Sequence, residues 1–233
     1  MLYYTKDGKV IDINTKNYLN SGTQGKISLI EPSICLKEYT ISNQTKSIFD
    51  DMGTTFNQEM FDYFKFNFND SNLCELYDLL YDDKLTTVLG YTMKYYQETI
   101  NNILTMPTSY ILDNYNKIYE LVLKLTDECI RIVDLNSRNI INTDNQMVVI
   151  DYDKYYLDND TEKDLLTYLN KSALIFAFKG IFKDSLKKLG INIENNSEIN
   201  SQLFSLFTIN TTSLVLKYRL QSYNKPIDYF TKR

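Results

Sequence analysis

The chain has 233 residues but contains no histidine and only three cysteines. Zinc sites are built largely from His and Cys, and the catalytic triads of hydrolases depend on a histidine base. We therefore expect neither a typical zinc site nor a His-dependent triad. The cysteines, Cys35, Cys74 and Cys129, are odd in number, widely spaced and embedded in apolar segments. This pattern predicts reduced, buried thiols in a cytoplasmic protein.

Long apolar runs and clusters of like charge are also missing. No stretch approaches the ~18 apolar residues of a membrane span, and residues 1–7 do not resemble a signal peptide. The net charge is −5, and the 25 Lys and Arg residues are scattered, so we expect neither nucleic acid nor a membrane as a partner. Without repeats or low-complexity linkers, the length favours one compact unit, although ~100–200 residues per domain would also allow two.

The most informative segment present is Ile130–Tyr155, IRIVDLNSRNIINTDNQMVVIDYDKY. Asp134 and Asn139 stand in a D-x-x-x-x-N frame. After a polar turn, an apolar strand leads to Asp151 and Asp153. The pattern places a base, an amide oxygen and metal-seeking carboxylates around one point. Phosphoryl transfer from ATP needs this set, because its chemistry is mostly positioning and charge neutralisation through Mg²⁺.

This frame resembles the catalytic and metal-binding segments of the protein-kinase-like superfamily. The resemblance implies that Asp134 orients and deprotonates an acceptor hydroxyl. It also implies that Asn139 and Asp151 hold Mg²⁺, with Asp153 supporting them or joining as a further metal carboxylate. ATP and Mg²⁺ would be the cofactors, and the acceptor would be a hydroxyl of a protein or a small molecule.

Upstream, residues 19–27 resemble a kinase glycine-rich loop, in which Gly22 and Gly25 turn backbone N–H groups towards the ATP phosphates. An ordinary hairpin turn is the alternative. In the next strand, Cys35-Leu36-Lys37 resembles the A-x-K of the third kinase strand. There a small residue packs on adenine, and the lysine pairs with the α- and β-phosphates. As a strand-end lysine at a cleft, Lys37 is expected to do no core packing.

A helix predicted at 54–64 would supply the glutamate that holds this lysine. Its apolar residues recur at four-residue steps, and Glu59 lies beside them as the candidate for the Lys37–Glu59 ion pair. A solvated helix glutamate is the alternative. Glu75 is a poorer candidate, because it opens a strand-like segment.

Two strands are predicted at 73–83 and 85–96, around an Asp-Asp-Lys turn. The second resembles the strand that leads into a kinase hinge, where the backbone hydrogen-bonds adenine. By that resemblance Met93 is the gatekeeper, and the segment from Lys94 to Tyr96 is the hinge.

Several positions depart from the superfamily pattern. Asn136 stands where Ser/Thr kinases have a lysine, which removes one charge near the γ-phosphate. Arg138 matches the arginine of the tyrosine-kinase loop and is the candidate replacement, a solvated arginine being the alternative. The Asp-Phe-Gly triplet becomes Asp151-Tyr152-Asp153. The short activation segment after it is more typical of choline and aminoglycoside phosphotransferases than of regulated protein kinases.

The second half of the chain reads as helical. A buried apolar stripe predicts a helix at 110–129, and a helix at 162–182, apolar on most sides, is expected to be buried all round. Near its start, Asp164 is either a buried brace of the catalytic loop or part of a capping box with Thr161. Two further helices are predicted, at 197–207 and 212–223, with apolar stripes that include Phe204 and Leu214, and Pro226 is expected to stop the second.

The predicted fold is α+β and kinase-like. Residues 1–96 would form a small N-lobe with an antiparallel sheet and one helix, and residues 97–233 a mostly helical C-lobe. The predicted function is transfer of the γ-phosphate of ATP to a hydroxyl, as in a small atypical bacterial-type protein kinase or a small-molecule phosphotransferase. The alternative is a pseudokinase, which binds nucleotide or protein without transferring phosphate.

Overall fold

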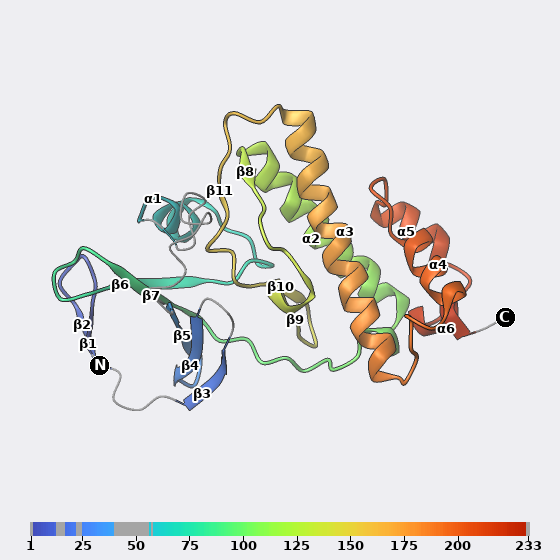
Figure 1. Cartoon of the computed structure of the whole chain (residues 1–233), viewed down its shortest axis with the longest axis horizontal. Helices are drawn as coiled ribbons and strands as arrows, with labels where there is room; N and C mark the ends of the chain where they lie inside the picture. Colours follow the sequence, from blue (N-terminus) through green and yellow to red (C-terminus); the bar gives the residue numbers. More distant parts are fainter. Residues whose placement is uncertain (1, 13–16, 22–24, 40–55, 57, 232–233) are drawn as a thin grey trace. The chain divides into compact units, whose positions relative to one another are not determined.

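The computed structural model describes residues 2–12, 17–21, 25–39, 56 and 58–231. The chain divides into two compact units, Met1–Tyr96 and Gln97–Arg233. Most strands belong to the first unit and most helices to the second (Figure 1). The fold class is α+β, as predicted.

The first unit is built on one antiparallel sheet of seven strands, in the order β2-β1-β6-β7-β5-β4-β3. The strands are β1 Leu2–Tyr4, β2 Val10–Asp12, β3 Asn17–Ser21, β4 Gly25–Glu31, β5 Ile34–Tyr39, β6 Leu76–Tyr81 and β7 Val88–Lys94. Both predicted strands after the helix therefore form, but each is shorter at both ends. The turn between them is fixed by Asp82, whose carboxylate accepts hydrogen bonds from the backbone N–H groups of Thr86 and Thr87.

Two glycines allow the strands on either side of β5 to approach it. A Cβ at Gly25 would lie 2.5 Å from the carbonyl oxygen of Glu38, and a Cβ at Gly90 would lie 2.1 Å from that of Lys37. Both distances are far below van der Waals contact, so only glycine fits. The strand β5, which carries Lys37 and lies between β7 and β4, therefore packs closely against both neighbours.

One short helix lies between β5 and β6 in the chain. The predicted helix at 54–64 is observed as α1, Gln58–Asp62, followed by a π-helical turn, Tyr63–Asn67; residues 54, 55 and 57 lie outside the described part. The predicted apolar face is buried, since Phe56, Met60 and Phe64 are at most 6% exposed. It continues into the sheet through an edge-to-face contact of the Phe56 ring with Tyr91.

The second unit is mainly helical, with one small hairpin and a second two-stranded sheet. Its helices are α2 Thr108–Asp127, α3 Lys163–Lys188, α4 Ser197–Leu206, α5 Ser213–Leu220 and α6 Pro226–Thr231. Its strands are β8 Ile130–Arg131, β9 Ile140–Asn142, β10 Met147–Val149 and β11 Tyr156–Leu157, paired as β9–β10 and β8–β11. The helices α2 and α3 pack against each other, and α4 to α6 follow beside them (Figure 1). The predicted apolar stripe of α2 is buried.

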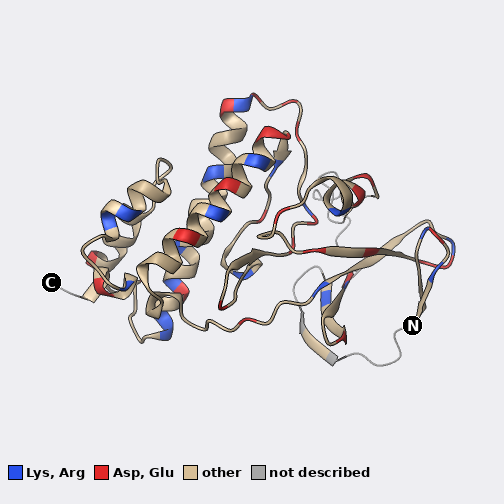
Figure 2. Cartoon of the chain, turned by 180° about the vertical axis from the view of Figure 1, so that it is seen from behind, with Lys and Arg blue, Asp and Glu red and all other residues tan. Residues whose placement is uncertain are grey.

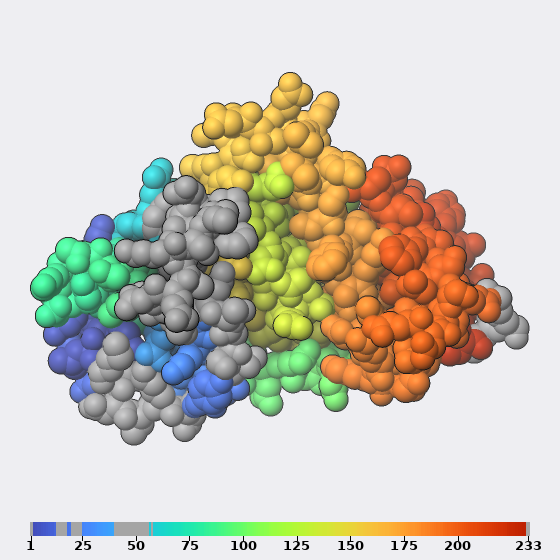
Figure 3. Space-filling model, viewed as in Figure 1, coloured from blue at the N-terminus to red at the C-terminus, as the bar shows by residue number. Residues whose placement is uncertain are grey.

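The long helix α3 differs from its prediction in length and burial. It continues six residues beyond Phe182, and it is not buried all round, because Leu165 is 51% and Phe176 67% exposed. Part of α3 accordingly lies on the molecular surface (Figure 3). By length and composition alone α3 could cross a membrane, which the sequence had not suggested. However, α3 packs against α2 and contains the fully buried Asn170, as the core helix of a folded domain does.

The helices near the end of the chain are close to the predictions, with one correction. α4 and α5 match the predicted 197–207 and 212–223 but are shorter, and Phe204 and Leu214 on their predicted apolar stripes are exposed. Pro226, expected only to stop a helix, begins α6, because proline is well tolerated in the first turn.

Candidate functional site

Lys37 lies inside β5 and not at its end. It pairs in register with Ile27 of β4 and Tyr91 of β7, and its residue is only 3% exposed. Its ammonium lies over two rings, 5.6 Å from the centroid of Tyr39 and 5.8 Å from that of Tyr91. The expectation that Lys37 does no core packing is therefore wrong: its alkyl chain is part of the packing of this sheet.

The other nucleotide-binding candidates of this unit are placed only in part. Gly22 lies outside the described residues, whereas Gly25 is buried at the start of β4. Cys35 is buried in β5, opposite Met93 in register. Burial raises the pKa of the Cys35 thiol to about 12, so this thiol stays protonated and is a packing group at neutral pH.

Glu59 is exposed on α1. In the described part of the chain, no ion pair joins Glu59 to Lys37. The poorer candidate, Glu75, is engaged elsewhere, since its carboxylate lies 3.7 Å from the ammonium of Lys94. The Lys37–Glu59 pair stays a prediction, because α1 is a short helix and a glutamate side chain is long enough to move.

In the expected hinge, two of the three backbone N–H groups are already in use. The N–H of Lys94 donates to the carbonyl of Glu75 at 2.9 Å, and that of Tyr95 to the carbonyl of Ser33 at 2.8 Å. Among the described residues, the Tyr96 N–H meets no acceptor. Tyr96 is therefore the residue of this segment whose backbone N–H is left for another acceptor.

The loop around Asp134 is held by hydrogen bonds between its own polar groups. Asp134 has a left-handed backbone, with φ +62°, a conformation that Asp and Asn tolerate better than most residues. Its carbonyl accepts hydrogen bonds from the side-chain amides of Asn136 (3.0 Å) and Asn139 (2.8 Å). The two asparagines thus fix the backbone that presents the Asp134 carboxylate.

The β9–β10 hairpin brings Asn139 and Asp151 together. Asn139 directly precedes β9, Asp151 follows β10 by two positions, and the N–H of Ile150 donates to the carbonyl of Asn139 at 2.9 Å. Because the amide nitrogen of Asn139 is spent on Asp134, its oxygen is the atom left for another ligand. Asp151 also has a left-handed backbone, with φ +59°. Two such residues at one site indicate function more than packing.

Three carboxylates of this region act electrostatically on one phenol. Tyr155 is buried, and burial raises the pKa of its hydroxyl; the negative charges of Asp151, Asp134 and Asp153 raise it further. These carboxylates therefore lie close enough to act on one group. The phenol therefore stays protonated at neutral pH.

The oxygens of Asn139, Asp151 and Asp153 fit Mg²⁺ only if a substrate supplies further oxygen ligands. Within the part of the chain that the structure describes, no group of three His, Cys, Asp or Glu side chains is arranged to hold a metal ion. Mg²⁺ in phosphoryl-transfer sites is bound by one or two carboxylates together with substrate phosphates and water. The hard oxygens of Asn139, Asp151 and Asp153 fit that requirement, whereas a site made of protein ligands alone is not formed.

Asn170 of α3 braces this loop, a role that the sequence had suggested for Asp164. Its side chain accepts from the N–H of Ile132 at 2.9 Å and donates to the carbonyl of Ile130 at 2.9 Å and the hydroxyl of Thr126 at 3.0 Å. Asn170 is fully buried. One signal could have found it: a polar residue on the buried stripe of a helix needs hydrogen-bond partners.

Both expectations for Asp164 are wrong. It is exposed in the first turn of α3, so it braces nothing, and the residue before the helix is Glu162, without a side-chain cap. Thr161 is not the N-cap; its N–H donates to the carboxylate of Asp158. A second contact of α3 with the loop comes later in the helix, where Asp184 accepts from the hydroxyl of Ser137 at 2.8 Å.

Replacing Asn170 by leucine should destabilise the second unit markedly. The change leaves the N–H of Ile132 and the carbonyl of Ile130 buried without partners, at about 1–3 kcal/mol for each orphaned group. Urea unfolding monitored by circular dichroism measures the loss. The exposed Asn159, changed to leucine, is the control and should leave the midpoint unchanged. Equal midpoints for wild type and Asn170→Leu would show that the brace is unimportant.

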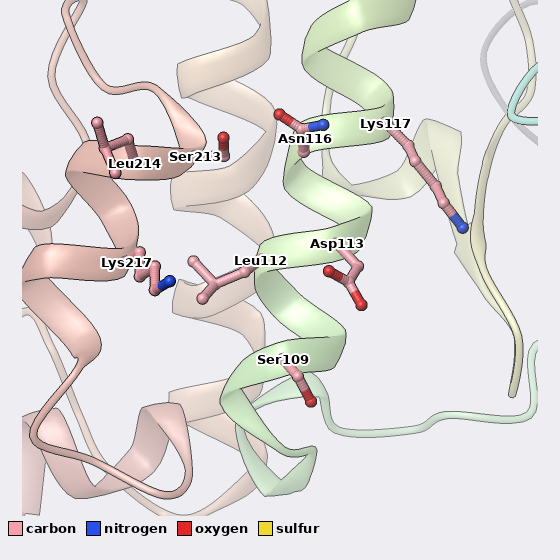
Figure 4. Close-up of a pocket in the computed structure, with 8 residues that line it drawn as sticks. All are labelled: Ser109, Leu112, Asp113, Asn116, Lys117, Ser213, Leu214 and Lys217. Carbon is pink, nitrogen blue, oxygen red and sulfur yellow. The ribbon is translucent and has the colours of Figure 1, made fainter.

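A separate pocket of about 600 Å³ lies between α2 and α5 (Figure 4). Its lining mixes the apolar Leu112 and Leu214 with charged and polar side chains such as Asp113 and Lys217. None of the sequence-predicted site residues lines it. Acidic and basic residues alternate along α2 from Asp113 to Asp127, whereas α3 carries more lysines than aspartates (Figure 2).

No protein-family model matches the chain, and no curated protein matches it.

Proposed function

We propose that the protein is an ATP- and Mg²⁺-dependent phosphotransferase of the protein-kinase-like class that transfers the γ-phosphate to a hydroxyl. The observation that carries the proposal is the loop in which Asn139 binds the Asp134 carbonyl beside the β10 end that presents Asp151. This arrangement holds a base, an amide oxygen and a carboxylate in a rigid frame, which phosphoryl transfer requires.

The first unit supports the same proposal by its order of elements. Two strands joined across the 22–25 segment are followed by the Lys37 strand, a helix, and two strands that end at the expected hinge. This order is the one that the resemblance to kinases implies for an N-lobe. Lys37, whose ammonium lies over the rings of Tyr39 and Tyr91, would pair with the ATP phosphates, as the resemblance to kinases implies.

The proposed roles follow from the chemistry of each group. Asp134 accepts the proton of the acceptor hydroxyl as the new O–P bond forms and the P–O bond to ADP breaks, and the bonding pair leaves on ADP. Asn139 and Asp151 would hold Mg²⁺, which neutralises charge on the phosphates. The Tyr96 N–H would meet the adenine edge. The free thiols of the chain are in keeping with the reducing cytoplasm, where we place the protein.

The direct test is incubation with γ-labelled ATP and Mg²⁺, alone and with a cell lysate separated into protein and metabolite fractions. Label in one fraction identifies the acceptor class. The alternative, a pseudokinase, is favoured by Asn136, whose neutral side chain stands where a lysine is expected. Nucleotide binding without label transfer to protein, metabolite or water would establish that alternative.

Asp151→Asn should abolish the Mg²⁺ dependence of nucleotide binding. Asparagine tolerates the left-handed backbone at this position, so the fold is kept, but a neutral amide does not replace a carboxylate on a hard cation. Titration of Mg²⁺ against bound nucleotide measures the effect, and the exposed Asp160→Asn is the matched control. An unchanged titration for Asp151→Asn would move the metal role to Asp153.

A further inference from the structure

Asn136 is neutral at a position where a lysine is expected. The positive charge expected near the γ-phosphate must therefore come from another residue. The side chain of Asn136 is fully used within the loop: its amide nitrogen donates to the carbonyl and to Oδ1 of Asp134, and its oxygen accepts from the N–H of Arg138. Arg138, the candidate replacement, is exposed. In the described structure no ion pair or side-chain hydrogen bond directs its guanidinium towards Asp134.

A different cation lies at the candidate base. The ammonium of Lys154 is 2.6 Å from Oδ2 of Asp134, a residue 20 positions earlier in the chain. The Lys154 side chain is only 20% exposed, against 45% for that of Asp134. Lys154 directly follows Asp153, so the segment that delivers the candidate metal carboxylates also delivers the ammonium. This ammonium pairs with the Asp134 carboxylate, and it is the cation that the fold places at the candidate base.

We propose that Lys154 contacts the transferred phosphoryl group and supplies the charge that Asn136 lacks; the proposal rests on the proposed phosphotransferase function. An acceptor oxygen bound to Asp134 lies about 2.6–3.2 Å from its carboxylate, and the phosphorus about 3–3.5 Å beyond. A lysine ammonium on a flexible four-carbon stem reaches that distance from its observed position. Arg138 has no comparable anchor.

The ion pair between Lys154 and Asp134 also implies an order of steps at the Asp134 carboxylate. In the structure, Asp134 Oδ2 is occupied by Lys154 and Oδ1 by Asn136. When the phosphates of ATP arrive, the ammonium moves from Oδ2 to the phosphoryl oxygens, and Oδ2 becomes the acceptor for the hydroxyl proton. The O–P bond then forms as the P–O bond to ADP breaks, the bonding pair leaves on ADP, and Asp134 later releases the proton to solvent.

The test compares Lys154→Met and Lys154→Arg with a matched control, Lys163→Met. Lys163 also pairs with an aspartate, Asp127, at 2.8 Å, but both side chains are largely exposed. Calorimetry with Mg²⁺ measures the affinities for ADP and for a β,γ-imido analogue of ATP, which differ by the γ-phosphate. Thermal melting reports stability, and transfer of label from ATP reports activity.

Lys154→Met should weaken binding of the ATP analogue about 10- to 100-fold, the worth of one charge-assisted hydrogen bond, and leave ADP binding unchanged. Lys154→Arg should restore most of the affinity because it keeps the charge, and Lys163→Met should behave as wild type. Unchanged analogue affinity in Lys154→Met, or equal losses for analogue and ADP, would overturn the role of Lys154 alone. A wild type that binds neither nucleotide would overturn the proposed function and this role with it.

Discussion

Asp134→Asn is expected to slow phosphoryl transfer by about 10²–10⁴-fold, the usual contribution of a positioned general base, with nucleotide affinity near that of wild type. Asparagine is preferable to alanine here, because Asp134 has φ +62° and alanine would add backbone strain of roughly 1 kcal/mol. Asparagine retains a side-chain oxygen of similar shape, so the loop is preserved while the proton acceptor is removed.

The measurement is single-turnover transfer to the acceptor found in the lysate fractions, with nucleotide affinity measured in parallel. Asp127→Asn is the control, since Asp127 also pairs with a lysine in the same unit but at an exposed site. It should transfer at the wild-type rate. Should Asp134→Asn also transfer at that rate, Asp134 is a structural residue of the loop and not the base.

Lys37→Met should reduce the affinity for ATP by about 10- to 100-fold, the equivalent of one charge-assisted contact, and bring transfer close to zero. Methionine keeps the buried alkyl volume between Tyr39 and Tyr91, so the first unit should unfold at a denaturant concentration similar to that of wild type. Lys37→Ala should lose both functions and, in addition, roughly 2–5 kcal/mol of stability, as for other buried long side chains cut to alanine.

The two Lys37 variants separate binding from packing. Equilibrium binding of ATP and urea unfolding are measured for both, with Lys84→Met as the control, because Lys84 is exposed in the β6–β7 turn. An unchanged ATP affinity for Lys37→Met would show that Lys37 is a packing residue and would contradict its proposed role in binding ATP.

Local patterns in the sequence were sufficient for several of the strands and helices. Apolar residues at every second position predicted the strands β6 and β7, and apolar residues three or four apart predicted the helices α2, α4 and α5. The observed ends of each element lie within a few residues of the predicted ends. The D-x-x-x-x-N frame predicted that Asp134 and Asn139 act together, and the hydrogen bond between them is present. These features depend on residues near one another in the chain, which is why they could be read from it.

Only the tertiary structure decided what lies around those residues. Asn170 reaches Ile132 across 38 positions, and Lys154 reaches Asp134 across 20; no local periodicity encodes such pairings. Lys37 seemed a strand-end charge, but strands on both sides of β5 enclose it. The sequence by itself determined the candidate base, its asparagine and the α+β class. Packing of distant segments determined which polar groups are buried, because burial depends on neighbours that come from elsewhere in the chain.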